Sequence, residues 1–480
     1  MNIPNSFPKS LSYTIKQMQG GMSRIGVKLT PDRTTGIVPN DVITYKLPNS
    51  SLCDLRTFNH FYQFSTSGTT GTFLHPRYAS SLIERISIII NGQTVDITPG
   101  YSMLYNTLMD LEGSSFDQFS KRNVCEFFDP SLKYTVTDPS SSSTADVAIA
   151  GANWTASGTS APSKIEGAVT HWLGFLGSCN PQVIDTSDLG DVYIQIQFST
   201  AYVLPATINS TAQTLAGASF TLDTLYSTCD VISFGDDSEY YNLKLSKLTT
   251  SGLNIGFYSY LNSRFAAVAK SSGISVNWNI SANSLDQLIC TMQKKDGTST
   301  WKPMIAYGSN DAGSTVYNMA QIIADPIGKV NNTGTTRTDV LGDAFMNSYY
   351  FIRAGQGIKE SRISINNRPL NYGYLSPKEV FIQTLTALGY NHIDLGTNGL
   401  NVGILSLQHF VKYYFAHIID LTIQDSQDFY IAGLNSLGST LTVTWDANFT
   451  TNYAQEIVPI MYARLTKVLY VQDGRNISVL

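Results

Sequence analysis

Glu84-Arg85-Ile86-Ser87-Ile88 returns in the second half of the chain as Ser361-Arg362-Ile363-Ser364-Ile365. A turn sequence follows each copy, at Asn91-Gly92 and at Asn366-Asn367. A run of four shared residues is weak evidence alone, because Arg-Ile-Ser-Ile can arise by chance. The repeat becomes informative because further features follow both copies in the same order.

The segments after each copy also correspond. Apolar residues at helical spacing come next, over residues 101–111 in the first half and 377–388 in the second. A strongly alternating strand and a closing β segment follow. Four features in one order indicate a duplicated β domain with a boundary near residues 235–238. The alternating and closing segments are Val192–Phe198 and Tyr226–Ile232 in the first half, and Leu441–Trp445 and Tyr462–Leu469 in the second.

Period-two alternation dominates the chain. In Val192-Tyr-Ile-Gln-Ile-Gln-Phe198 every second residue is apolar, and the same period occurs at Val276–Ile280 and Leu441–Trp445. Successive side chains of a strand point to opposite faces, so each segment predicts a half-buried strand, with Trp445 facing inward. Gly, Asn, Ser and Pro clusters separate these runs. The sequence therefore predicts a mainly β protein built of many short antiparallel strands.

Two low-complexity stretches interrupt the halves, at residues 135–163 and at residues 296–343. Loops of this length inside domains are commonly functional or are exposed elaborations. Both readings stay open here: a tolerated surface insertion, or a loop that faces the host or the environment.

The N-terminal segment, residues 1–33, differs from the rest because it is basic, and its prolines and glycines discourage early core structure. One reading is a solvated tail. The other is an arm that docks beneath neighbouring subunits or faces an anionic interior such as genome or lipid. Its basic residues are Lys9, Lys16, Arg24, Lys28 and Arg33, against the single acidic residue Asp32.

Composition limits the function classes. The 480 residues are 42% hydrophobic and only 14% charged, well under the roughly 25% of ordinary soluble chains. This favours large packed or contact surfaces. A net charge of −5 argues against specific nucleic-acid recognition, which needs clustered Lys and Arg. No apolar leader or membrane-spanning helix is expected. Five scattered cysteines indicate reduced core thiols and synthesis in a cytosol-like compartment.

No pattern for catalysis or cofactor binding emerges, so no catalytic, cofactor-binding or metal-ligating residue is predicted. The six histidines form no zinc motif, and His409 and His417 are interpreted as structural. Gly355-Gln-Gly357 opens no dinucleotide fingerprint, since Glu360 takes the third glycine's place. The acidic residues Asp236, Asp237 and Glu239 lack a calcium-loop spacing, and this segment is interpreted as a solvated linker.

The chain resembles the double jelly-roll major capsid proteins of virophages and polinton-like viruses, in the lineage of adenovirus and tailless-phage capsids. The resemblance covers nearly the whole chain past residue 25 and implies two tandem eight-stranded antiparallel jelly rolls with short flanking helices. They would span residues 34–235 and 236–480, with exterior loops near 135–163 and 296–343. The segments that carry it are Leu47–Arg56, Ile83–Val95, Arg362–Leu370 and Ile457–Asp473.

The same resemblance implies a non-enzymatic function. Three copies would form a pseudo-hexagonal homotrimeric capsomer, and capsomers would tile an icosahedral shell in the virion. Penton, minor capsid or cement proteins would be further partners, and the N-terminal arm would contact genome, lipid or minor proteins.

Two other classes stay open. A carbohydrate-binding or adhesin-type β protein, such as a virion spike, could use Trp154 and Trp301 to stack on sugar rings. A glycan-cleaving enzyme would need paired carboxylates in a cleft, and the sequence nominates no such pair.

Overall fold

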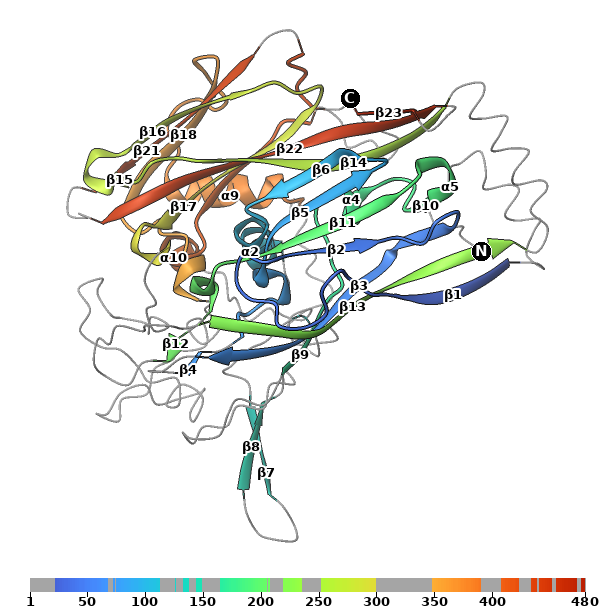
Figure 1. The fold of residues 1–480 in the computed structure, drawn as a ribbon. Helices are drawn as coiled ribbons and strands as arrows, with labels where there is room; N and C mark the ends of the chain where they lie inside the picture. The colour runs from blue at the N-terminus through green and yellow to red at the C-terminus, as the bar shows by residue number, and fades with distance from the viewer. Residues whose placement is uncertain are drawn as a thin grey trace, which may run out of the picture.

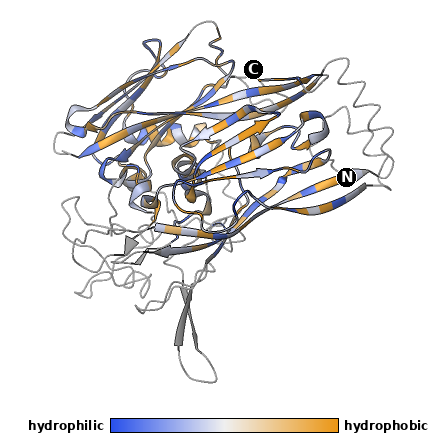
Figure 2. Ribbon diagram, viewed as in Figure 1, coloured by the Kyte–Doolittle hydropathy of each residue, from blue (hydrophilic) through white to orange (hydrophobic). Residues whose placement is uncertain are grey.

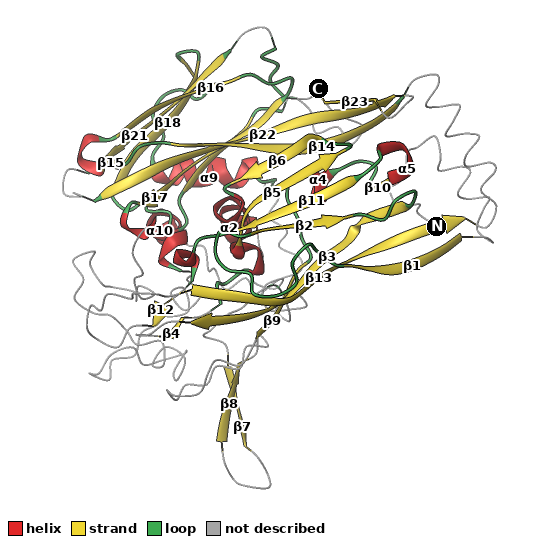
Figure 3. Ribbon diagram, in the orientation of Figure 1, coloured by secondary structure: helices red, strands yellow, loops and turns green. Residues whose placement is uncertain are grey.

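The structure of the protein is a computed structural model, and Figure 1 shows its ribbon. It places two antiparallel β-sandwiches side by side, with short helices packed between and beneath their sheets (Figures 1 and 3). The structure describes residues 22–67, 72–73, 75–112, 126, 133–137, 144–148, 165–204, 206–207, 219–234, 252–298, 348–389, 407–422, 433–437, 440–450, 455–472 and 476–479.

The N-terminal sandwich comprises the described residues 22–234. In its first sheet the order is β1-β13-β3, and both β9 and β10 pair with β3. The second sheet has the order β2-β11-β5-β6. The strands are β1 Met22–Leu29, β2 Val42–Lys46, β3 Leu52–Ser67, β5 Ile83–Ile90, β6 Gln93–Pro99, β9 Ile165–Val169, β10 Val183–Asp185, β11 Val192–Phe198 and β13 Ser219–Phe234, with a short pair β4 Thr72–Phe73 and β12 Ala206–Thr207.

The C-terminal sandwich comprises the described residues 252–479. Its first sheet has the order β14-β22-β17-β20, with β15 and β23 also paired to β22. Its second sheet has the order β16-β21-β18-β19. The strands are β14 Leu253–Arg264, β15 Val268–Ala269, β16 Ile274–Ile280, β17 Leu285–Lys294, β18 Ile358–Ile365, β19 Arg368–Pro369, β20 Ala416–Asp420, β21 Leu441–Phe449, β22 Glu456–Gln472 and β23 Asn476–Val479.

The two sandwiches have the same topology. The order β1-β13-β3-β9 corresponds to β14-β22-β17-β20, and β2-β11-β5-β6 corresponds to β16-β21-β18-β19. Eight strands of one sandwich therefore have counterparts in the other. The repeated Arg-Ile-Ser-Ile stretches lie at equivalent positions in β5 and β18. The predicted duplication and the eight-stranded pattern are confirmed.

The cores of both sandwiches follow the alternation read from the sequence. In β11 the apolar residues are buried and the residues between them are half-buried. In β21 Leu441, Val443 and Trp445 are buried in the same way, which confirms the predicted inward direction of Trp445. Hydrophobic and hydrophilic residues alternate along these strands in Figure 2. Removing apolar area from water at about 25 cal/mol per Å² is the main force that holds each pair of sheets together.

A buried polar chain crosses the C-terminal sandwich beside Trp445. The indole Nε1 of Trp445 donates to Ser361 Oγ at 3.0 Å, and Ser361 Oγ lies 2.8 Å from His417 Nδ1. His417 Nε2 lies 3.0 Å from the Gln383 side-chain oxygen. Because that oxygen can only accept, the His417 proton lies on Nε2, and Ser361 donates to Nδ1. These hydrogen bonds connect β18, β20 and β21 with helix α9 (Pro377–Ala387).

The helices follow equivalent strands. Helix α2 (Tyr101–Glu112) comes after β6, and α9 (Pro377–Ala387) comes after β19. A capping box begins α9, since Ser376 accepts from the Glu379 backbone and the Glu379 side chain accepts from the Ser376 backbone. The shorter helices are α4 Phe175–Ser178, α5 Thr186–Leu189 and α10 Leu407–Tyr413.

The N-terminal arm predicted over residues 1–33 is wrong for part of its length. Residues 22–29 form β1, which pairs with β13 along its whole length from Met22 opposite Phe234 to Leu29 opposite Ser227. The alternation Ile25, Val27, Leu29 gives this segment a strand pattern, and Leu29 is buried in the core. The basic charge of the segment concealed that pattern.

Several other predictions fall partly or wholly outside the described residues. The domain boundary near residues 235–238 stays a prediction. The predicted loop at 135–163 includes part of a hairpin, β7 Lys133–Thr137 with β8 Thr144–Ala148, which projects from the body in Figure 1. Of the loop at 296–343, the structure describes only a short 3-10 turn, Asp296–Thr298. Trp154, Trp301 and Cys125 lie outside the described residues.

The remaining sequence interpretations concern thiols, histidines and membranes. Cys53, Cys179, Cys229 and Cys290 are buried free thiols, as predicted. His409 lies in α10 and the buried His417 lies in β20, so the two do not share one element. Among the described residues, no helix is both long enough and apolar enough to cross a membrane.

Candidate assembly surfaces

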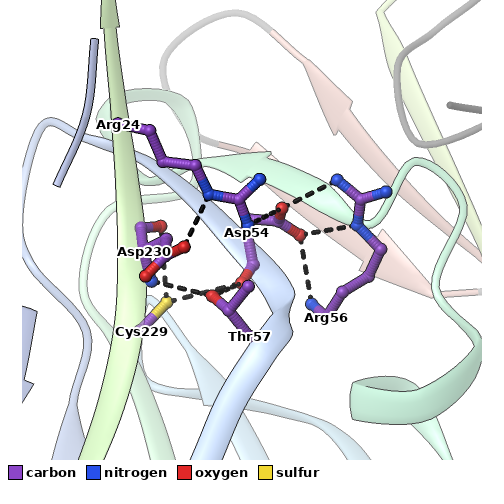
Figure 4. Close-up of polar contacts among 6 residues, drawn as sticks. All are labelled: Arg24, Asp54, Arg56, Thr57, Cys229 and Asp230. Carbon is purple, nitrogen blue, oxygen red and sulfur yellow. Dashed lines mark hydrogen bonds and ion pairs between the residues drawn. The ribbon is translucent and has the colours of Figure 1, made fainter. Parts of the chain in front are cut away.

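An ion-pair cluster holds the N-terminal strand β1 against its sheet (Figure 4). The guanidinium of Arg24 donates from Nε to Asp230 at 2.5 Å and from Nη2 to Asp54 at 2.9 Å. Arg56 contacts the same Asp54 through Nε at 2.9 Å and Nη2 at 2.7 Å. The Asp54 side chain is fully buried, so two arginines compensate a carboxylate that has no access to water.

Backbone groups complete this cluster and join it to β3 and β13. Thr57 Oγ1 donates to the Asp54 carbonyl at 2.8 Å and accepts from the Asp230 amide at 2.8 Å. Figure 4 shows Cys229 beside them, with its thiol 3.7 Å from the Asp54 carbonyl. β1 is thus fixed by side chains as well as by its ladder.

Other basic residues of the N-terminal segment are also engaged within the sandwich. Lys28 lies over the Tyr226 ring, 4.2 Å from its centroid, and Arg33 pairs with Asp41 at 3.0 Å. These residues therefore act within the fold and do not form part of a free basic arm. Lys9 and Lys16 lie outside the described residues.

The two sandwiches meet along the outer edge of β14. Asn180 and Gly256 exchange two backbone hydrogen bonds, at 2.8 and 3.2 Å. Two residues further along, the Tyr258 amide donates to Ser178 Oγ at 2.8 Å. The segment that contains α4 therefore acts as a short extra partner for the edge of the C-terminal sandwich. An unpaired strand edge is covered here within the chain.

Side chains continue this junction beneath the backbone contacts. Phe175 of α4 meets Phe257 of β14 edge to face, with ring centroids 5.0 Å apart. Asp96 of β6 accepts from Ser259 Oγ at 2.6 Å and from the Phe175 amide at 3.0 Å. Burial raises the pKa of Asp96, and these two hydrogen bonds counteract part of that shift.

Gly174 makes the close approach at the junction possible. Its φ is +72°, and a Cβ atom there would lie 2.6 Å from Thr98 Oγ1 and 2.8 Å from Asp96 Oδ2. Any side chain would displace the Asp96 carboxylate that binds the C-terminal sandwich.

A buried ion pair joins the C-terminal half of α2 to the other sandwich. Arg353 Nη2 lies 3.0 Å from Asp110 Oδ2, and Arg77 Nη1 lies 3.6 Å from Asp110 Oδ1. All three side chains are almost completely buried. At the other end of α2, the Tyr462 hydroxyl donates to the Gly100 carbonyl at 3.2 Å. α2 is thus fixed to the C-terminal sandwich at both ends.

A cavity of about 310 Å³ lies in this seam. Burial raises the pKa of Glu84, and its carboxylate accepts from Ser102 Oγ at 3.2 Å. Glu84 is the one carboxylate among the lining residues, so this cavity does not supply the carboxylate pair of a glycan hydrolase. The lining residues are Glu84, Pro99, Gly100, Ser102, Met103, Asn262, Arg264, Tyr350, Ile460 and Tyr462.

Three solved structures match this architecture over nearly its full length. PBCV-1 VP54, as fitted into a reconstruction of the virophage Sputnik, matches with a TM-score of 0.57 and 12% identity over 95% of this chain and 96% of that one. The quasi-atomic PBCV-1 capsid gives 0.55 and 13%, over 95% and 96%. The Faustovirus major capsid protein gives 0.51 and 10%, over 94% and 91%.

The fold is the double jelly roll. The expected resemblance to double jelly-roll capsid proteins is confirmed at the level of fold. No family model matches the chain, and no curated protein matches it. At this level of identity, the two rolls and their order carry the likeness, and individual residues do not.

A second surface of this double jelly-roll chain carries exposed aromatic and aliphatic side chains beside α9. Tyr372 is 83% exposed, Ile382 is 54% exposed and Tyr374 is 37% exposed. The Tyr372 hydroxyl donates to Glu379, and this contact is the main cause that lowers the pKa of Glu379 to about 2. The Arg362 guanidinium lies 4.3 Å from the Tyr374 ring centroid.

The sequence missed the polar residues that build these surfaces. Asp54 and Arg56 lie in a segment used for the resemblance, but no local pattern pairs them with Arg24 and Asp230. The sequence also gave no signal for the Asp110–Arg353 contact. The prediction that residues 236–239 form a solvated linker falls outside the described residues.

Proposed function

We propose that this chain is the major capsid protein of a virus, and that its copies assemble into pseudo-hexagonal homotrimeric capsomers which tile an icosahedral shell. The observation that carries the proposal is the duplicated roll: the same eight-stranded order occurs twice in one chain, and capsid proteins share it over more than nine-tenths of their length. The function is structural, and the protein resides in the virion shell.

The physical properties of the chain support this role. Two rolls packed through α2, α4 and β14 form one broad block, and only 14% of all residues are charged. Removing water from a surface with few charges costs little free energy, which favours obligate interfaces of about 2,000–5,000 Å². Penton and minor capsid or cement proteins would complete the shell. The adhesin alternative rested on Trp154 and Trp301, and no observation on the described residues favours it.

The assembly state tests this proposal directly. We expect light scattering of the purified chain to give a stable particle of three copies of 52.6 kDa, about 158 kDa. Electron microscopy of the native source should show the same protein as the main shell component. A particle that stays at 52.6 kDa at every concentration would count against the capsid proposal.

Deleting residues 1–21 is expected to leave the soluble trimer folded and to impair shell formation. These residues precede β1, so the deletion keeps the Arg24–Asp54 contact and the β1–β13 ladder. Light scattering would follow the trimer, and electron microscopy would follow the shells. A second deletion, of residues 1–29, serves as the contrast, because it removes β1 and should lower the melting temperature. Loss of the trimer on the shorter deletion would contradict a role in shell contacts.

A further inference from the structure

The cavity in the seam takes its walls from both rolls. β5 and the first turn of α2 supply Glu84 and Met103, while β14 and β22 of the C-terminal roll supply Arg264 and Tyr462. β6 and β14 lie side by side in Figure 1, which brings these walls together. The volume of about 310 Å³ lies at the lower end of the range of small-molecule sites, about 300–1,000 Å³. The cavity is therefore large enough for a small organic ligand.

Two opposite charges line this cavity without pairing. Glu84 belongs to the N-terminal roll and Arg264 to the C-terminal roll. Within the described part of the chain, no ion pair joins these two side chains. They still lie within electrostatic reach of each other: burial raises the pKa of Glu84, and the hydroxyl of Ser102 and the charge of Arg264 counteract part of that rise. A ligand between the two groups could therefore contact both.

Both charged groups keep hydrogen-bonding capacity for such a ligand. A carboxylate can accept several hydrogen bonds, and a guanidinium can donate several. Glu84 accepts from Ser102 Oγ at 3.2 Å, and among the described residues it has no second hydrogen-bond donor. Arg264 donates from Nη2 to Gln293 Oε1 at 2.6 Å and lies beside the Tyr350 hydroxyl. Arg264 is exposed and Glu84 is half-buried, so the positive charge lies nearer to solvent than the negative one.

The rest of the wall is largely apolar. Pro99, Met103 and Ile460 contribute aliphatic surface, and two tyrosines contribute rings. The hydroxyl of one of them, Tyr462, is already bonded to the Gly100 carbonyl at 3.2 Å. Small-molecule sites commonly combine such apolar walls with a few polar groups that fix the orientation of the ligand. The walls therefore fit a ligand with an apolar part as well as two charged ends.

We propose that this cavity binds a free amino acid with an apolar side chain, which places its ammonium group against Glu84 and its carboxylate against Arg264. The ligand links the two rolls across the seam, because each roll supplies one of the two charges. An amine without a carboxylate would leave Arg264 without a ligand contact, and a carboxylate without an amine would bring a second negative charge close to Glu84. The site goes beyond the proposed capsid function and does not depend on it.

Three related compounds test the need for both charges. L-Phenylalanine carries both groups, phenethylamine lacks the carboxylate, and 3-phenylpropionate lacks the ammonium. Isothermal titration calorimetry with the purified full-length protein would measure the three affinities. We expect L-phenylalanine to bind about tenfold or more tightly than either analogue, because each analogue loses one hydrogen-bonded ion contact. L-Phenylalanine should also raise the melting temperature, since it binds only the folded chain.

Two substitutions then assign each charge to its partner. Glu84→Gln is expected to weaken the binding of L-phenylalanine about tenfold or more and to leave that of 3-phenylpropionate unweakened. Arg264→Gln should also weaken L-phenylalanine, but it should leave phenethylamine unweakened. The analogue that each variant still binds shows that its cavity remains folded. The melting temperature without ligand gives a second check of folding.

Matched controls remove the same charges elsewhere. Glu166→Gln neutralises an exposed carboxylate on β9, and Arg85→Gln removes an exposed guanidinium on β5. Neither residue lines the cavity. Both controls should bind L-phenylalanine with the affinity of the unmodified protein.

The opposite outcomes would each overturn the proposal. No binding of L-phenylalanine at millimolar concentration would show that the cavity is not an amino-acid site. Equal affinities for the three compounds would show an apolar cavity that does not recognise the charges. Equal losses in the cavity variants and in the controls would reduce the effect to net charge. None of these results concerns the assembly of copies, so the capsid proposal is tested separately by the size of the particle.

Discussion

Lowering the pH from 7 to 5 is expected to reduce the free energy of unfolding by up to about 6 kcal/mol, because three histidines are buried in the neutral form. Burial lowers the pKa of His60, His75 and His417 to about 3 each. In the unfolded chain each would titrate near 6.5. Below that value the unfolded state binds more protons than the folded state, so stability falls as the pH falls. Each histidine contributes about 2 kcal/mol to the loss by pH 5.

The surroundings of these histidines explain why they stay neutral. His60 Nδ1 lies 2.9 Å from the Tyr45 hydroxyl, and His75 Nε2 lies 2.8 Å from the Tyr62 hydroxyl. His75 Nδ1 donates to the Pro76 carbonyl at 2.6 Å, so its Nε2 accepts. These hydrogen bonds bring no negative charge that could stabilise an imidazolium.

Buried carboxylates act with the opposite sign. Burial raises the pKa of Glu84, Asp96 and Asp286, so each of them costs stability at neutral pH and regains it as the pH falls through its folded value. The net loss at pH 5 is therefore smaller than the sum over the histidines.

Denaturant unfolding at pH 7 and pH 5, at one fixed protein concentration, measures this loss. His60→Asn keeps a partner for Tyr45 and removes one titrating group, so the difference between the two pH values should shrink by about 2 kcal/mol. Tyr45→Phe is the matched control, because it removes the hydroxyl but keeps His60 buried. An unchanged pH difference in His60→Asn would show that His60 does not contribute.

Replacing Trp445 with alanine is expected to cost about 3–5 kcal/mol of stability. Trp445 is completely buried between the sheets of the C-terminal roll, so the substitution opens a large cavity there. It also removes the indole Nε1, which donates to Ser361 Oγ at the start of the polar chain to His417 and Gln383. The lost packing is the larger contribution, since one hydrogen bond is worth about 1 kcal/mol.

Two further variants separate the causes. Trp445→Phe removes the donor and only part of the ring volume, so it should cost clearly less than the alanine variant. Thr444→Ala changes the preceding residue, which lies half-buried on the opposite face and donates from Oγ1 to Asn277 Oδ1 at 2.7 Å. We expect its effect to stay within about 1 kcal/mol. Urea denaturation would rank the three, and equal losses for Trp445→Ala and Thr444→Ala would contradict the inward position of the indole.

The sequence predicted the fold where local periodicity reports burial. Alternation placed β11 and β21, helical spacing placed α2 and α9, and the order of features revealed the duplication. β1 was missed because its basic residues outweighed a short alternation of Ile25, Val27 and Leu29. Its partner is the last strand of the roll, and single-sequence patterns carry no information about pairing across such a distance.

The assembly surfaces could not be predicted for a related reason. Asp110 and Arg353 are isolated charges in the sequence, and nothing local indicates that they meet in a buried pair. The exposure of Ile25 and Ile382 depends on which side of each roll its neighbour covers. Contacts of this kind follow from the packing of the two rolls, which only coordinates describe.

The position of β1 also constrains how the chain can fold during its synthesis. β1 leaves the ribosome first but pairs with β13, at the end of the same roll, and β14 pairs in the same way with the late strand β22. Each roll therefore stays open at one edge until its last strand emerges, and such distant pairing is slow. An unpaired strand edge can pair with another chain, so each roll is most exposed to incorrect pairing before its last strand emerges.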